Sequence, residues 1–262
     1  MRLEIEHSGL DKTRNAIIFF PAFPTPRDMY VEQIKIFSKN GIPYISLNYP
    51  GIGKSDKPDK IEMTVSDLVS VIWNNIKDLP FDKLIPIGTS MGGYVMFEMW
   101  RQHRDRIAGF VFCHTRPEAL DEEARKKRLS DIDRIKQDRL SYLETFSKSL
   151  VSDYSYQNKP KVVEFISEIV KNTTEEGLCY LVHVIATRPD SRDLLKDITV
   201  PSLVIAGKSD KIVPLDVMKN MADSLPNSTF VEFENVGHLS ALEIPEEFNS
   251  VVLSFLDSKS II

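Results

Sequence analysis

The sequence is poor in cysteine and has no excess of positive charge. Its two cysteines, Cys113 and Cys179, lie in apolar runs and do not have the spacing of a zinc or redox motif. Acidic residues outnumber basic ones by 38 to 33, which gives a formal net charge of -5. This balance gives no support for nucleic-acid binding. We therefore expect two packed thiols and no nucleic-acid partner.

Long apolar runs are absent as well. No run reaches the length of a membrane span, and the N-terminus lacks a positively charged region followed by an apolar block. Internal repeats and low-complexity tracts are also missing. A chain of 262 residues forms one α/β domain or two small ones, and it buries a core without disulfides. These absences lead us to expect a soluble cytoplasmic protein with no membrane partner.

The most informative segment that is present spans residues 88–93, with the sequence G-T-S-M-G-G. It matches the G-x-S-x-G motif with Ser90 at its centre. Residues 83–87 before it are typical of a buried strand, and residues 94–101 after it have helical spacing. Such a sharp turn exposes the serine hydroxyl on a strained backbone, and Gly88 and Gly92 avoid collisions with its neighbours. Ser90 is therefore the candidate nucleophile.

Two downstream residues are the candidate partners of Ser90. A serine hydroxyl is a weak nucleophile, so it needs a histidine to take its proton and a carboxylate to orient that histidine. Asp210 lies just past a predicted strand at 201–207, where α/β sheets place their chemistry. His238 follows a second predicted strand at 229–233. The order Ser, Asp, His is the one found in the hydrolase fold.

With the G-x-x-D segment at 207–210 and the G-H pair at 237–238, the chain resembles the α/β-hydrolase superfamily from residue 16 to residue 256. The resemblance implies that Ser90 is the nucleophile, His238 the general base and then acid, and Asp210 the group that orients His238. It also implies an α/β-hydrolase fold, with a mostly parallel central sheet, helices on both faces and an inserted helical cap.

The distribution of strand and helix signals divides the chain into three parts. Up to residue 115, strands alternate with amphipathic helices, which predicts a mostly parallel sheet. Residues 116–197 lose the strand signals and become charged and helical, and the alternation returns at residue 198. We therefore predict a core domain of residues 1–115 and 198–262, with residues 116–197 as a helical cap inserted in it.

Residues 118–133 are especially rich in charge and include R-K-K-R at 125–128. One interpretation is a solvated helix face. The alternative is that one arginine or lysine turns inward and binds a carboxylate on the substrate.

The oxyanion of an acyl-transfer intermediate requires two backbone N–H donors. Met91, the residue after the nucleophile, supplies one of them. The other is expected in the loop P-A-F-P-T-P at 21–26, which follows a predicted strand at 16–20. Pro21 and Pro24 have no N–H, which leaves Ala22 and Phe23, and by position Phe23 is the donor. The alternative is that this loop is a proline-stiffened connector without a catalytic part.

Two further histidines are candidates for substrate binding. His114 ends a predicted strand at 107–113 and so approaches the pocket, while His183 lies in an apolar helical run at 178–185. The alternative for His114 is a buried residue at the strand end, and the alternative for His183 is a packed or pocket-wall residue of its helix.

The junction T-R-P-E-A at 115–119 is similar to that of esterases and lactonases related to 3-oxoadipate enol-lactonases. This favours a small-molecule ester or lactone substrate, cleaved through an acyl-enzyme without a metal or an organic cofactor.

The same triad also serves thioester hydrolysis, C–C bond hydrolysis and perhydrolysis. A weakly catalytic ligand receptor on the same fold is the alternative from a different class. The oligomeric state stays open.

Overall fold

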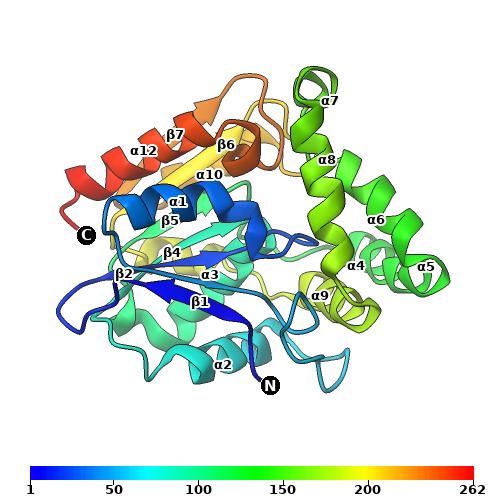
Figure 1. The fold of residues 1–262 in the computed structure, drawn as a ribbon, viewed down its shortest axis with the longest axis horizontal. Helices are drawn as coiled ribbons and strands as arrows, with labels where there is room; N and C mark the ends of the chain where they lie inside the picture. Colours follow the sequence, from blue (N-terminus) through cyan, green and yellow to red (C-terminus); the bar gives the residue numbers. More distant parts are fainter.

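A computed structural model describes all 262 residues, and a seven-stranded sheet forms its centre (Figure 1). The strand order is β1-β3-β2-β4-β5-β6-β7, and only β1 runs antiparallel to its neighbour. The predicted mostly parallel sheet is therefore confirmed. The strands are β1 (Ile5–Ser8), β2 (Ala16–Phe20), β3 (Tyr44–Leu47), β4 (Leu84–Thr89), β5 (Phe110–Cys113), β6 (Ser202–Gly207) and β7 (Ser228–Phe233).

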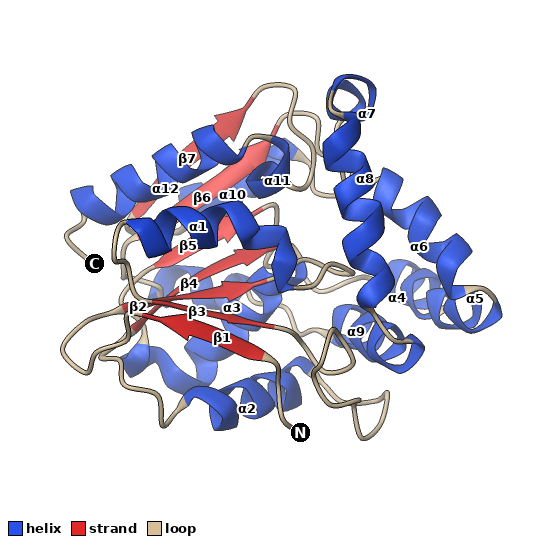
Figure 2. Cartoon of the chain, in the orientation of Figure 1, coloured by secondary structure: helices blue, strands red, loops and turns tan.

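Helices cover both faces of the sheet, which explains why β2 is buried along its whole length. Successive strand residues point to opposite faces. Phe19 accordingly packs on Phe37 of α1, with ring centroids 5.6 Å apart, whereas Gly92 of α3 approaches the backbone of Phe20. Figure 2 shows α1 and α12 on one side and α2 and α3 on the other. The helices outside residues 116–197 are α1 (Val31–Lys39), α2 (Val65–Ile76), α3 (Met91–His103), α10 (Leu215–Ser224), α11 (Ser240–Glu243) and α12 (Pro245–Ser258).

Residues 116–197, the inserted segment from here on, leave the sheet after β5 and return to it at β6. They are helical, as expected, and stand beside the sheet on the right of Figure 1. The inserted segment contacts the core at Gly51, which follows β3. A Cβ on Gly51 would lie 2.4 Å from the Cα of Gly177 in α9, so the two backbones are in direct contact. The helices of the inserted segment are α4 (Glu122–Leu129), α5 (Asp131–Gln137), α6 (Arg139–Lys148), α7 (Asp153–Asn158), α8 (Pro160–Ile169) and α9 (Glu175–Thr187).

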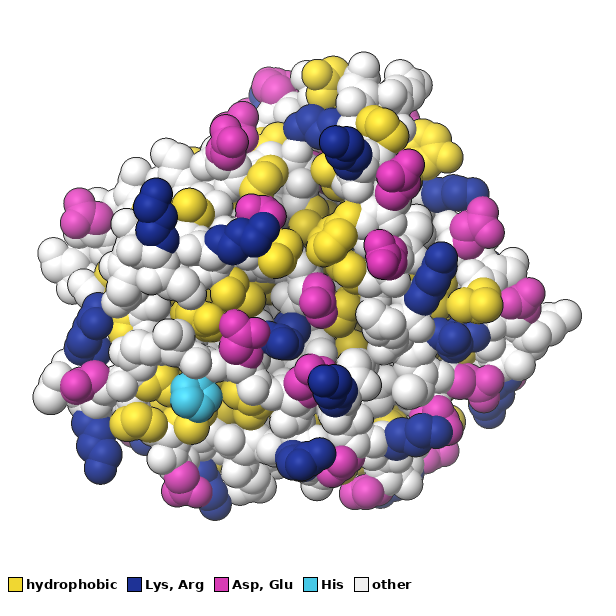
Figure 3. All heavy atoms as spheres, viewed as in Figure 1, with side chains coloured by type: hydrophobic (Ala, Val, Ile, Leu, Met, Phe, Trp, Pro, Cys, Tyr) yellow, Lys and Arg dark blue, Asp and Glu magenta, His cyan; other side chains and the backbone are white.

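The surface carries charges of both signs. On the face in Figure 3, basic and acidic side chains are interspersed without a region of one sign. No helix is both long and apolar enough to cross a membrane.

Candidate active site

Ser90 occupies a strained turn between β4 and α3. Its φ of 55° and ψ of -111° lie outside the regions that residues with a Cβ normally adopt. Two hydrogen bonds hold this conformation: Ser90 N–H donates to the carbonyl of Cys113 at 2.9 Å, and Thr115 Oγ1 donates to the carbonyl of Ser90 at 2.7 Å. The end of β5 at Cys113 and the segment just after it, at Thr115, thus fix the turn that presents the Ser90 side chain.

Two glycines make this turn sterically possible. A Cβ on Gly92 would lie 2.2 Å from the carbonyl oxygen of Phe20, and a Cβ on Gly88 would lie 2.8 Å from the backbone of Gly92. The first turn of α3 therefore lies closer to β2 and to the end of β4 than a side chain at either glycine would allow. The sequence motif predicted this crowding from the two glycine positions.

Asp210 and His238 are joined by a short hydrogen bond. Nδ1 of His238 lies 2.8 Å from Oδ2 of Asp210, and both side chains are 1% exposed. The other oxygen, Oδ1, accepts the N–H groups of Ile212 and Val213 at 2.8 and 3.1 Å. Because Nδ1 of His238 must carry a proton to donate to a carboxylate, Nε2 of the neutral ring is left as a proton acceptor.

The electrostatics of Asp210 favour its ionised form. Burial opposes ionisation most strongly, but the positive charge that His238 carries when it is protonated, together with hydrogen bonds from His114 and His238, outweighs it. Together they hold the pKa of Asp210 well below its ordinary value. Asp210 is therefore a permanent acceptor for His238 at neutral pH.

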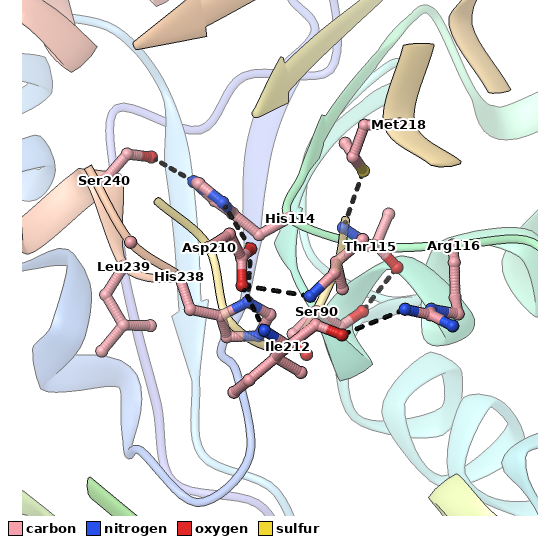
Figure 4. Close-up of polar contacts among 12 residues, drawn as sticks. Ser90, His114, Thr115, Arg116, Asp210, Ile212, Met218, His238, Leu239 and Ser240 are labelled. Carbon is pink, nitrogen blue, oxygen red and sulfur yellow. Dashed lines mark hydrogen bonds and ion pairs between the residues drawn. The ribbon is translucent and has the colours of Figure 1, made fainter. Parts of the chain in front are cut away.

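His114 is a second histidine on the same carboxylate. Its Nδ1 lies 3.1 Å from Oδ2 of Asp210, and its Nε2 lies 2.8 Å from Oγ of Ser240 (Figure 4). The residue is fully buried and has a φ of 48°. His183 lies elsewhere, with Nδ1 3.3 Å from the carbonyl of Met63. Neither histidine lines the cavity that contains Ser90. Their assignment to substrate binding stays a prediction, and the contact that the structure gives His114 is with Asp210.

Glu243 is a functional candidate that the sequence did not reveal. Its carboxylate accepts the N–H groups of Gly237 at 2.9 and 3.1 Å and of Leu239 at 3.3 Å, which flank His238 on both sides. It also accepts the N–H and the hydroxyl of Ser152 from the inserted segment, at 3.1 and 3.0 Å. The only sequence signal was one acidic residue in the run S-A-L-E-I at 240–244, and its burial depends on tertiary contacts.

The loop after β2 leaves one suitable backbone donor. The N–H of Ala22 donates to Sδ of Met29 at 3.2 Å, while the N–H of Phe23 donates to no group of the protein. Tyr49 holds the loop by donating its hydroxyl to the carbonyl of Pro21 at 3.2 Å. Met91 begins α3, where backbone N–H groups have no partner within the helix. This arrangement is compatible with Phe23 and Met91 as oxyanion donors.

Ser90 and His238 line one small cavity of about 30 Å³. This volume holds about one water molecule, so a larger ligand requires the wall to open. One side of the wall belongs to the inserted segment. The lining residues are Phe23, Ser90, Tyr94, Arg128, Phe146, Leu150, Ile185, Ile212 and His238.

The imidazole and carboxylate atoms of His114, Asp210 and His238 lie within 4.8 Å of one another, close enough for a metal ion to be considered. Both Nδ1 atoms, however, are at hydrogen-bond distance from one Asp210 oxygen, and the other oxygen already accepts two N–H groups. We interpret the cluster as a hydrogen-bonded network.

The sequence is similar to that of a known protein family and of several individual proteins. The model of the alpha/beta hydrolase fold family matches residues 15–245. The AB hydrolase superfamily protein YisY of Bacillus subtilis is 26% identical over 254 residues, which cover 92% of this chain and 91% of that protein. A 2-hydroxy-6-oxononadienedioate/2-hydroxy-6-oxononatrienedioate hydrolase of Paraburkholderia phymatum is 25% identical over 245 residues, covering 87% and 81%.

Among solved structures, a thermophilic esterase from Thermogutta terrifontis with malate bound superimposes with a TM-score of 0.88 at 29% identity. The match covers 98% of this chain and 93% of the esterase. The enol-lactonase of Burkholderia xenovorans LB400 superimposes with a TM-score of 0.83 at 21% identity, covering 97% and 96%. At that identity the enol-lactonase supports the fold alone.

Proposed function

The chain belongs to the alpha/beta hydrolase fold family, and on this premise we propose that it is a serine hydrolase that cleaves a small carboxylic ester or lactone. One observation carries the proposal. Ser90 lies on its strained turn in the same cavity as His238, whose other ring nitrogen is bound to Asp210. This combination supplies a nucleophile, a base and a group that orients the base.

In the proposed first half-reaction, Ser90 Oγ attacks the ester carbonyl carbon while Nε2 of His238 takes the hydroxyl proton. The carbonyl π electrons move to oxygen, where the N–H groups of Phe23 and Met91 stabilise the negative charge. When the tetrahedral intermediate collapses, His238 gives its proton to the leaving alkoxide. Asp210 stabilises the transient imidazolium without taking its proton.

In the second half-reaction, His238 removes a proton from water, and the resulting hydroxide attacks the acyl-enzyme. The tetrahedral intermediate then releases the carboxylic acid, and the proton returns from His238 to Ser90 Oγ. Besides the substrate and one water molecule, the proposed steps use side chains and backbone N–H groups of this chain. Its product from a lactone is a hydroxy acid, because the leaving alcohol stays attached to the acyl group.

We further infer that residues 1–115 and 198–262 form the core domain and that residues 116–197 act as a cap. Arg128, Phe146, Leu150 and Ile185 of the inserted segment line the cavity, so their positions limit what reaches Ser90. Substrate entry then requires these side chains to move away from Phe23 and His238.

The proposal is tested by hydrolysis of short- and medium-chain 4-nitrophenyl esters, with wild type compared to Ser90→Ala. Steady turnover that vanishes in the variant supports a serine esterase and ranks the acyl lengths. A burst of one equivalent without turnover supports a receptor-like protein with a reactive serine. Equal activity in the two proteins would overturn the assignment. Lactones, thioesters and C–C substrates are then compared under the same conditions, because the triad serves all of these reactions.

A further inference from the structure

One arginine of the charged stretch in the inserted segment faces inward. Arg125 and Lys126 of α4 are 47% and 74% exposed and pair with Glu122 on the same helix. Arg128 is only 21% exposed and lines the cavity that contains Ser90. Arg125 and Lys126 therefore face solvent, whereas Arg128 forms part of the cavity wall.

Arg128 has donors that the protein does not use. Its Nη1 donates to Asp131 at 3.0 Å, and no other protein atom accepts a hydrogen bond from the guanidinium. Asp131 is shared, because it also accepts a hydrogen bond from Arg134 at 2.9 Å. The guanidinium lies over the rings of Phe23 and Phe146, at 5.9 and 5.5 Å from their centroids. Its plane is thus held by aromatic contacts while part of its N–H fork stays free.

Arg188 places a second positive charge behind the same wall. It is 5% exposed and forms no ion pair with a carboxylate. Its Nε and Nη1 donate to the carbonyls of Glu118 and Ile185 at 3.0 and 2.7 Å. The guanidinium carbon lies 4.1 Å from the centroid of the Tyr94 ring, and both Tyr94 and Ile185 line the cavity.

A third arginine strengthens this positive region. Arg116 donates to the carbonyl of Ile212, another lining residue, at 3.0 Å. Burial is the main reason that the pKa of Arg188 is lowered. The charges of Arg116 and Arg128 lower it further, against the opposing influence of Tyr94 and Glu118. Arginine nevertheless stays protonated in proteins, so this wall carries positive charge that Glu118 and Asp131 do not fully balance.

We propose that this wall is a carboxylate subsite, in which Arg128 binds a carboxylate of the substrate remote from the ester carbonyl at Ser90. Arg188 and Arg116 contribute the positive potential behind it. The inference rests on the proposed function and narrows it: the substrate is an anionic ester or lactone. A planar carboxylate matches the free part of the guanidinium fork, and low solvent exposure strengthens the attraction.

The test compares pairs of esters that have the same shape and differ in charge. Monomethyl glutarate is paired with methyl 5-methylhexanoate, and 4-acetoxybutanoate is paired with 4-methylpentyl acetate. The first pair places the carboxylate in the acid part and the second in the alcohol part. We expect wild type to prefer the anionic member of one pair. Arg128→Gln lowers kcat/KM for that anionic ester about 10- to 100-fold and leaves the neutral ester within about threefold.

Arg125→Gln, on the exposed face of the same helix, is the matched control and leaves the preference unchanged. Arg128→Met keeps the apolar stem over Phe23 and Phe146, so it separates charge from packing, and circular dichroism verifies that each variant folds. Absence of a preference in both pairs, or equal loss for the charged and neutral esters, would overturn the subsite.

A binding measurement separates failure of the subsite from failure of the proposed function. Calorimetric titration of Ser90→Ala with glutarate needs no turnover. Weaker glutarate binding after adding Arg128→Gln, by about 10-fold or more, supports the subsite even if no ester is hydrolysed. Unchanged binding, or no binding to either protein, would overturn the subsite while leaving Ser90-dependent hydrolysis of neutral esters intact.

Discussion

His114 places Nδ1 3.1 Å from Oδ2 of Asp210, although the two residues are 96 positions apart in the chain. Ser240 lies on the other side of the imidazole, 2.8 Å from Nε2. If Nδ1 donates to the carboxylate, the neutral ring leaves Nε2 to accept the Ser240 hydroxyl proton. His114 is thus a positioning residue for Asp210, and Ser240 sets its tautomer.

Replacing His114 tests this positioning role. We expect His114→Leu to lower kcat for a neutral ester about 10-fold with little change in KM, because Asp210 loses a charge-assisted hydrogen bond. His114→Asn keeps a donor and tolerates the positive φ of 48°, so a smaller loss is expected. Separate measurement of kcat, KM and melting temperature distinguishes positioning from mere packing. Full activity in a folded His114→Leu protein would mean that this histidine only fills space.

The contrast between Ser90 and His114 shows what the sequence was able to predict. The Ser90 turn depends on residues within a few positions of it, so the motif predicted its strand, turn and helix. The structure adds the true bounds, with α3 beginning at Met91 rather than at residue 94. The link from His114 to Asp210 depends on β5 lying beside β6, where His114 N–H donates to the carbonyl of Ile205 at 3.0 Å. Nothing local to either residue encodes that neighbourhood.

The wall of the cavity was beyond prediction for a similar reason. Sequence spacing left open whether a cationic residue of 125–128 turns inward, because the alternatives differ only in how α4 rotates against the core. The stacking of Arg128 over Phe23 and Phe146 joins two regions that are more than 100 positions apart. Packing of this kind decides both the size and the charge of the cavity.

Substitution of Ser90 probes chemistry and backbone strain together. Ser90→Ala should reduce turnover on the order of 10⁴-fold or more, because the nucleophile is lost. Its fold should persist, since the Ser90 hydroxyl makes no hydrogen bond within the protein. Ser90→Gly should be equally inactive but melt at a higher temperature than Ser90→Ala, because glycine adopts a φ of 55° without strain on the order of 1–3 kcal/mol. Calorimetry of the two variants compares them, and a lower melting temperature for Ser90→Gly would contradict the strain argument.

Glu243 provides a test of how the His238 loop is held. Glu243→Gln replaces an acceptor with a group that also presents donors to the N–H groups of Gly237 and Leu239. We expect the free energy of unfolding to fall by about 2–4 kcal/mol, since buried N–H groups lose their acceptor. Activity should fall as well, because these N–H groups flank His238. Urea titration measures the stability, and Glu247→Gln on the exposed side of α12 is the control, expected within about 0.5 kcal/mol of wild type.

Asp210 gives a prediction with a defined sign in pH. Its pKa in the folded state is lowered below the ordinary value of 3.8, so folding favours the ionised carboxylate. The stability from this group is fully present above the ordinary value and is lost as pH falls toward the lowered pKa of the folded state. Asp210→Asn removes that contribution, so its stability deficit relative to wild type should be constant from pH 7 to about 5 and shrink below about 4. Turnover at pH 7 should fall about 10⁴-fold, because an amide can hold His238 in the wrong tautomer. Denaturant titrations between pH 3 and 7 decide the matter: a deficit that widens toward acid would mean that burial, rather than the two histidines, determines the pKa of Asp210.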